Sequence, residues 1–244
     1  MQASEANYKG YLITLLLLLL LWEVASYLIS NPALPNPIDV LALMLSRRGL
    51  LSHTAMSLLR VIYSLALALS LAFPAGIFSR EKIVDVTVSP VIYLLYPIPH
   101  IVLLPLYILI FGIGDLSRVL LIATILFFQI AVTTRDAAKQ VSDYYIYSIL
   151  SLGASKLDIY RHVIIPAVMP KIMTALRISI GTAIAVLFFA ESFATTSGLG
   201  YLIIDSWSRA DYKMMYAAIT TMALLGFILY VIVESIERRV CRWM

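Results

Sequence analysis

Charged residues are scarce in this chain of 244 residues. Asp, Glu, Lys and Arg make up 13% of it, whereas about 25% is usual in soluble domains. With 61% hydrophobic residues, this scarcity excludes an ordinary soluble protein and predicts an integral membrane protein. Six apolar segments and their connections use up the length, so we expect one transmembrane domain over residues 1–244.

Cysteine is nearly absent as well. The single one, Cys241, excludes an internal disulfide bond and leaves the redox compartment undetermined. It lies just past the last apolar segment, where we favour an unreactive juxtamembrane thiol over a lipidated one. The net charge of +4 indicates a membrane protein rather than nucleic-acid binding, because the cations sit beside apolar segments.

Several catalytic and metal-binding patterns are missing. The chain has no Gly-x-x-x-x-Gly-Lys-Ser/Thr loop, so its energy must come from a partner or a gradient. His53, His100 and His162 are far apart and show no metal-ligand spacing. Ser197 could suggest a serine nucleophile, but no histidine is well placed to serve it. We therefore predict that the chain is not an enzyme and itself binds no cofactor or metal.

Long apolar segments are what the sequence has in abundance. Backbone groups in lipid must be hydrogen-bonded internally, so each segment is predicted to be a helix. The predicted fold class is an all-α polytopic membrane protein with about six transmembrane helices. We take the first as an uncleaved span, because its apolar character continues past Glu23. The predicted spans are residues 10–30, 56–78, 86–110, 117–134, 172–192 and 214–235.

Lys and Arg are distributed unevenly over the two sides of these spans. If both termini are cytoplasmic, 12 of the 18 Lys and Arg residues fall inside, which is the distribution that membrane proteins favour. Residues 135–171 then form the longest cytoplasmic loop. After the first span, Pro32 and Pro35 end its helix, and Pro37 suits the first turn of a short interfacial helix over Ile38–Leu45.

The 135–171 loop is predicted to hold two short helices. The first covers about Ser142–Leu150, and Gly153 behind it suits a left-handed C-terminal cap. The second begins at Ser155, with Asp158 three residues later in a capping pattern, and is expected to stop at Pro166.

Three residues of the second helix are predicted to share a face. Ala154, Leu157 and Tyr160 recur at three-residue spacing. This face is either a docking surface for another protein or part of a loop that folds back on the membrane.

The same loop resembles that of the permease subunits of ATP-binding-cassette importers. Their motif is Glu-Ala-Ala, three residues, Gly, nine residues and Ile-x-Leu-Pro. Here Gly153 is followed by nine residues and then by Val163-Ile164-Ile165-Pro166. The Glu-Ala-Ala positions hold Tyr147-Ser148-Ile149, which departs from the motif.

Other segments are similar to the nitrate, sulfonate and taurine branch of these permeases and occur in the same order. They cover most of the chain after about residue 20. These segments are Leu34–Met44, His53–Val61, Tyr96–Ile122 with its Phe111-Gly112-Ile113-Gly114-Asp115 turn, and Ala190–Ile203.

The resemblance implies a permease subunit in the cell's inner membrane that forms the path for a small anionic or organic solute. It implies a coupling helix between helices 4 and 5, a cytoplasmic ATPase that binds ATP and Mg²⁺, and an extracytoplasmic binding protein. The other expected partners are a second copy of the permease, in a homodimer, and membrane lipid. No nucleic acid is expected as a partner.

The resemblance also suggests two sets of site residues. The ATPase-coupling set is Leu152, Gly153, Ala154, Ser155, Lys156, Leu157, Tyr160 and Pro166. The pathway or gating set is Pro97, Pro99, Arg177, Ser179, Thr182, Glu191, Gly198 and Gly200. The second set also allows structural alternatives. The small residues of the span at 172–192 could serve helix packing, and the prolines could simply kink their helix. Arg177 could snorkel to the membrane surface, and Glu191 could have a structural role.

Two other functions are alternatives to an importer permease. A gradient-driven transporter or channel usually carries acidic residues at mid-membrane, and this chain has almost none there. An assembly subunit without a path of its own would suit a chain that lacks the coupling motif.

Overall fold

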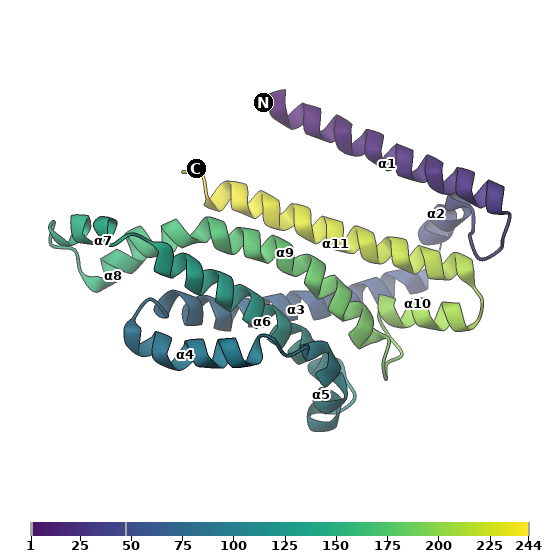
Figure 1. Ribbon diagram of the computed structural model, residues 1–244. Coiled ribbons are helices and arrows are strands. Elements are labelled where there is room, and N and C mark those ends of the chain that lie inside the picture. The colour runs from purple at the N-terminus through teal and green to yellow at the C-terminus, as the bar shows by residue number, and fades with distance from the viewer. Residues whose placement is uncertain (1, 47, 244) are drawn as a thin grey trace.

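The computed structural model describes residues 2–46 and 48–243, and in these ranges helices are joined by turns without any strand (Figure 1). The predicted all-α fold is therefore confirmed. Residues 1, 47 and 244, which the predicted domain includes, lie outside the described residues, and the single domain stays a prediction.

The bundle is built on long helices that lie along one axis (Figure 1). Small residues allow close contact between them: Ala68 and Ala72 on α3 and Ala131 on α6 have no exposed surface. Gly76 of α3 packs directly on Thr134 of α6. Close packing of small residues is the main attraction between helices in lipid, where burial of apolar surface contributes little. The long helices are α3 (Arg48–Phe78), α6 (Asp115–Gln140), α9 (Ile165–Glu191) and α11 (Tyr212–Val240).

Four helices of the described chain are long and apolar enough to cross a membrane: α3, α6, α11 and the run that ends with α9. A fifth span exists if the bent pair described next crosses as one unit. In α1 (Gln2–Ile29), the apolar part among the described residues is Ile13–Ile29. Six spans and cytoplasmic termini therefore stay predictions.

The span predicted at 86–110 is not one kinked helix. It is divided into α4 (Lys82–Leu95) and the pair η1 (His100–Leu103) and α5 (Leu104–Phe111), which meet at 84°. Pro97 and Pro99 lie in the break, because proline lacks the N–H that a helix needs and disfavours helical backbone in the residue before it. The two prolines thus break the helix more sharply than a kink would.

The expected stop at Pro166 is also wrong. The helical run continues from Lys156 to Glu191 as 36 residues, through α8 (Lys156–Ile159), the π-helical turn η2 (Tyr160–Ile164) and α9. In the π turn the Ile165 amide donates to the carbonyl of Tyr160, five residues back. Because a π turn widens the helix just ahead of Pro166, the proline ring and its missing N–H are accommodated. The loop predicted at 135–171 is correspondingly shorter.

The remaining short helices lie at opposite ends of the bundle (Figure 1). α2 (Pro37–Ser46) and α10 (Leu199–Ser208) lie at one end, and α7 (Asp143–Leu150) and α8 lie at the other. The start of α2 at Pro37 and the α7 helix confirm the predicted elements.

Replacing Gly76 by valine tests the contact between α3 and α6. A Cβ atom there would lie 2.5 Å from Thr134 Cβ and 3.0 Å from the Arg135 amide nitrogen. We expect the free energy of unfolding, measured by denaturant titration in mild detergent, to fall by about 1–3 kcal/mol. Gly49→Val is the control, since a Cβ at Gly49 meets nothing within 4 Å. Equal stability of the two variants would contradict this packing.

Candidate functional site

Two regions of the structure bring together residues from the predicted sites. We call the first the arginine cluster, at the α10 end of the bundle. We call the second the α7–α8 tip, which covers residues 142–160 at the other end. The arginine cluster comprises Ser57, Arg60, Asp115, Arg118, Glu191 and Ser197.

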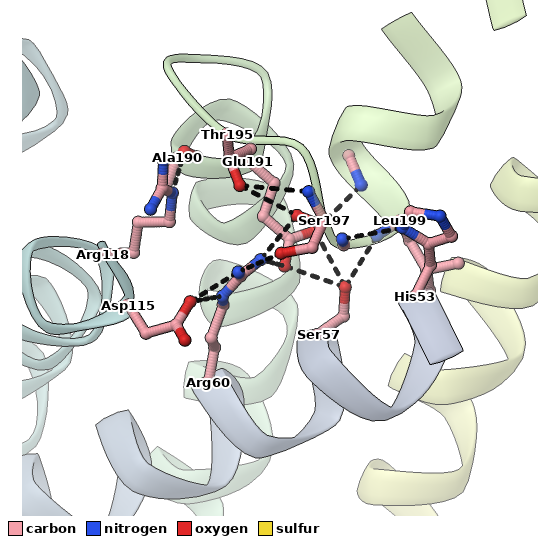
Figure 2. Close-up of polar contacts among 12 residues, drawn as sticks. His53, Ser57, Arg60, Asp115, Arg118, Ala190, Glu191, Thr195, Ser197 and Leu199 are labelled. Carbon is pink, nitrogen blue, oxygen red and sulfur yellow. Dashed lines mark hydrogen bonds and ion pairs between the residues drawn. The ribbon is translucent and has the colours of Figure 1, made fainter. Parts of the chain in front are cut away.

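Arg60 lies at the centre of the arginine cluster (Figure 2). Its Nε donates to Asp115 Oδ1 at 2.8 Å and its Nη1 to Glu191 Oε1 at 2.6 Å. The same guanidinium donates to the carbonyl and the hydroxyl of Ser197, each at 2.9 Å. Its side chain is 3% exposed, so a buried cation is balanced by two carboxylates from different helices. Such a pair is costly to break, because one charge would be left buried alone.

Glu191 has no exposed surface and caps the start of α10. The Gly200 amide donates to Glu191 Oε2 at 2.9 Å, and the Leu199 amide donates to Ser57 Oγ at 2.8 Å. The Gly198 amide donates to His53 Nδ1 at 3.0 Å. The first amides of a helix have no partner within it and carry partial positive charge, so side-chain acceptors and a carboxylate stabilise them.

Two glycines make room for Glu191. A side chain at Gly198, where φ is +109°, would overlap the Glu191 carboxylate. A Cβ at Gly200 would lie 2.7 Å from the Phe188 carbonyl oxygen. Glycine is needed at both positions for the α10 backbone to approach the carboxylate.

Arg118 stabilises the loop that leads from α9 to α10. Its side chain donates to the carbonyls of Gly114 and Ala190, at 2.6 Å and 3.1 Å. It also donates to the carbonyls of Phe193, at 3.0 Å, and Ala194. Ala194 has a φ of +47°, a conformation that few non-glycine residues adopt. A buried guanidinium that binds four carbonyls therefore holds a turn that would otherwise be unfavourable.

The arginine cluster thus connects α3, α6, α9 and α10 into one unit. Most of its polar groups bind one another, and the Asp115 carboxylate is the part of the cluster that is about half exposed. Within residues 2–46 and 48–243, no three His, Cys, Asp or Glu side chains group as metal ligands.

The structure brings together some of the predicted pathway residues and separates others. Glu191, Gly198 and Gly200 meet in the arginine cluster. Ser179 is buried and Thr182 half-buried on α9, while Pro97 and Pro99 are exposed at the α4–α5 break.

Arg177 lies elsewhere, beside a groove between α9 and α11. Its Nε pairs with Glu237 Oε2 at 3.2 Å. The groove has a volume of about 640 Å³ and a mostly apolar lining that includes Gly181, Ala223 and Gly226.

The sequence prediction missed most of the arginine cluster. Arg60 and Arg118 entered the prediction only through the total of Lys and Arg residues on the two sides, and Asp115 only as part of a turn. The sequence did carry a signal for this cluster, because Arg60 and Arg118 both lie within apolar segments. Charged groups inside a membrane are costly unless they are paired, so each of these arginines needs a partner.

The α7–α8 tip is stabilised by local caps. Gly153 has a φ of +83°, and its amide donates to the Leu150 carbonyl at 2.9 Å. The Ala154 amide donates to the Ile149 carbonyl at 3.2 Å, so the predicted left-handed cap is confirmed.

The start of α8 is capped as well. The Asp158 amide donates to Ser155 Oγ at 3.3 Å, and the Ser155 amide donates to Asp158 Oδ2 at 2.9 Å. This reciprocal capping box confirms the predicted helix start.

Arg80 joins the tip to the bundle. Its Nη1 donates to the carbonyls of Ala138 and Val141, each at 2.8 Å, at the end of α6. The same side chain pairs with Asp143 at the start of α7. The tip is therefore attached to α3 and α6 by ordered polar contacts.

The face predicted from three-residue spacing is divided in the structure. Leu157 is 74% exposed, and Leu152 next to the cap is 85% exposed. Tyr160 instead turns toward the bundle, where its ring lies 5.5 Å from that of Phe78 and its hydroxyl donates to Glu81 at 3.1 Å. Ala154 precedes the helix, so Leu152 and Leu157 are the apolar side chains that the turn and α8 present outward.

Cys241 is buried after the end of α11. Burial, with a smaller contribution from Glu237, raises the pKa of its thiol. A raised pKa lowers the fraction of reactive thiolate. The choice between an unmodified and a lipidated Cys241 stays a prediction.

Comparison with known proteins places these features in a family. Residues 64–242 match the protein family described as binding-protein-dependent transport system inner membrane component. The taurine transport system permease protein TauC of Escherichia coli is 32% identical over 93% of this chain and 86% of its own length. The formylaminopyrimidine transport permease protein ThiX of Halalkalibacterium halodurans is 28% identical over 93% of each chain.

A solved structure shares the fold. A chain of the MetNI methionine ABC transporter, in an inward-facing conformation, superposes with a TM-score of 0.61 at 19% identity. The match covers 79% of this chain and 94% of that one.

Replacing Arg60 by glutamine tests the arginine cluster. The Glu191 carboxylate would lose its buried cation, at a cost of about 3–5 kcal/mol. We expect hydrogen exchange of the amides of residues 198–200 to accelerate strongly, because their acceptors His53, Ser57 and Glu191 lose their fixed positions. Hydrogen–deuterium exchange with mass spectrometry measures this change.

Arg209→Gln is the control for that experiment. Arg209 pairs with Asp205 at 2.8 Å on the surface, where an ion pair contributes less than about 1 kcal/mol. Unchanged exchange at residues 198–200 in the Arg60 variant would show that the cluster does not hold α10.

Proposed function

The chain belongs to the family of binding-protein-dependent transport system inner membrane components, and we propose that it is the permease subunit of an ATP-driven importer. It is a multi-pass protein of the cell's inner membrane. Its relatives TauC and ThiX are transport permease proteins.

One observation carries the proposal: the α7–α8 tip is a rigid, capped element that exposes Leu152 and Leu157 at the end of the bundle. Large apolar side chains on an ordered protrusion are suited to a protein partner. The partner we propose is a cytoplasmic ATP-binding-cassette ATPase, which binds ATP and Mg²⁺ and hydrolyses ATP for the importer. The tip is then its coupling element, with Leu152, Gly153, Leu157 and their neighbours at the contact.

We propose a small anionic or organic solute as the cargo, delivered by an extracytoplasmic binding protein. Support comes from TauC, whose name specifies taurine, and ThiX, whose name specifies formylaminopyrimidine. Specificity would then depend largely on the binding protein.

The pore in this proposal is formed by two copies of the chain in a lipid bilayer. The groove between α9 and α11 supports it, because small residues such as Gly181 and Ala223 allow another helix to approach closely. Ser179, Thr182 and Arg177 on α9 stay candidates for the path between the copies, and Pro97 and Pro99 for a hinge.

The experiment that tests the proposal is native mass spectrometry of the chain purified from its own host in mild detergent. We expect two copies with two ATPase subunits. A chain without any ATPase, under conditions in which a control importer stays intact, would overturn the proposal in favour of gradient-driven transport.

Leu157→Asp tests the coupling element in the same complex. We expect ATPase activity that no longer responds to the loaded binding protein, because a carboxylate at the contact would be desolvated without a partner. Fully coupled uptake in proteoliposomes by this variant would show that the tip is not the coupling element. Asp136→Asn, a change at a surface carboxylate of α6, is the control and is expected to remain coupled.

A further inference from the structure

The α7–α8 tip has a surface property that differs from its surroundings. Residues 144–155 contain no charged side chain, although the neighbouring segments carry charges of both signs. Large side chains are nevertheless exposed there: Tyr144 by 73%, Tyr147 by 67% and Leu152 by 85%. An uncharged, aromatic surface of this kind marks an interaction site.

A layer of ion pairs separates this surface from the apolar helices. Arg80 pairs with Asp143, and Lys139 pairs with Asp85, between the apolar helices and the tip. Figure 1 shows α7 and α8 beyond both the turn from α3 to α4 and the charged end of α11. Tyrosines also gather at membrane interfaces, but this layer separates these tyrosines from the apolar helices, which favours a protein partner.

The exposed tyrosines have a defined direction. Tyr144 and Tyr147 are three residues apart and share one face of α7. Ile146 and Ile149 are partly buried and pack against the hydrophobic core. The packing of these neighbours orients α7 so that Tyr147 faces outward.

Positive charge borders the exposed apolar surface on α8. Lys156 directly precedes Leu157, Arg161 follows it by one turn, and both cations are exposed. The nearby Asp158 carboxylate, which is held in the capping box with Ser155, offsets one of these two positive charges, so the border keeps a net positive charge.

We propose that the α7–α8 tip binds an ATPase groove that has an apolar floor and an acidic rim. Tyr147 fills an apolar pocket in that floor, where permeases with the Glu-Ala-Ala motif present a carboxylate. Lys156 and Arg161 meet the acidic rim. This inference rests on the proposed function and specifies the partner's surface. Interface centres are depleted of charge and enriched in tyrosine, which frequently contributes a large share of binding energy.

The test uses the full chain in lipid nanodiscs and the ATPase subunit that copurifies with it. Tyr147→Glu restores the family's carboxylate and is expected to raise the dissociation constant by at least about tenfold, because a charge would enter an apolar pocket. Tyr147→Phe keeps the ring and is expected to bind within about twofold of the unchanged chain. Gln140→Glu is the matched control, since it adds the same charge at an exposed position of α6 outside the tip surface.

The rim is tested independently by Lys156→Glu combined with Arg161→Glu. A glutamate at position 156 suits the first turn of α8, so the helix should persist. We expect weaker binding and a smaller loss of affinity with rising salt, because two attractive charge contacts are removed. Arg209→Glu, at the opposite end of the bundle, is expected to change neither quantity.

Each outcome separates this inference from the proposed function. If no ATPase copurifies with the unchanged chain, the proposed function itself is wrong. If the ATPase binds the Tyr147→Glu chain as tightly as the unchanged chain, or if the rim variant keeps its salt dependence, the inference about the groove is wrong. It is also wrong if Tyr147→Glu retains the ATPase but loses a second copy of the chain.

Discussion

A guanidinium group buried between two carboxylates is the interaction on which the α10 end of this bundle depends. Arg60 of α3 binds Asp115 of α6 and Glu191 of α9, and the fully buried Glu191 carboxylate would otherwise be an unbalanced charge in an apolar surrounding. Glu191 in turn caps α10. Arg60 thus links the direction of α10, the turn that precedes it and the packing of three long helices. A change in any one of them would expose a buried charge or leave it without its partner.

Structure determined by neighbouring residues was predictable from the sequence. The start of α2 at Pro37, the left-handed cap at Gly153 and the capping box of Ser155 with Asp158 each involve atoms within a few residues of one another. Such signals depend on local backbone geometry, which the order of the residues specifies directly. Apolar length alone likewise located the long helices, because lipid leaves few alternatives to a helix.

Features that depend on distant segments were not predictable in the same way. Arg60 and Glu191 are 131 residues apart, and nothing near either residue specifies the other. At Pro166 a clear local signal gave the wrong prediction. Proline usually stops a helix, but the π turn ahead of Pro166 and the packing of α9 outweighed that tendency. At Pro97 and Pro99 the local signal was correct in kind, since the helix is interrupted there, but two prolines do not specify the 84° angle between the two helical parts.

The continuous run from Lys156 to Glu191 has a mechanical consequence. At 1.5 Å per residue, its 36 residues form a rod about 54 Å long, which joins the α7–α8 tip to the arginine cluster. The rod contains no non-helical joint. Its π turn at Tyr160–Ile164 keeps backbone hydrogen bonds across it, and Pro170 inside α9 lacks the N–H for one helical hydrogen bond. A displacement near Leu157 would therefore pass to Glu191 and the start of α10 along a continuous helix, with no loop between them to absorb it.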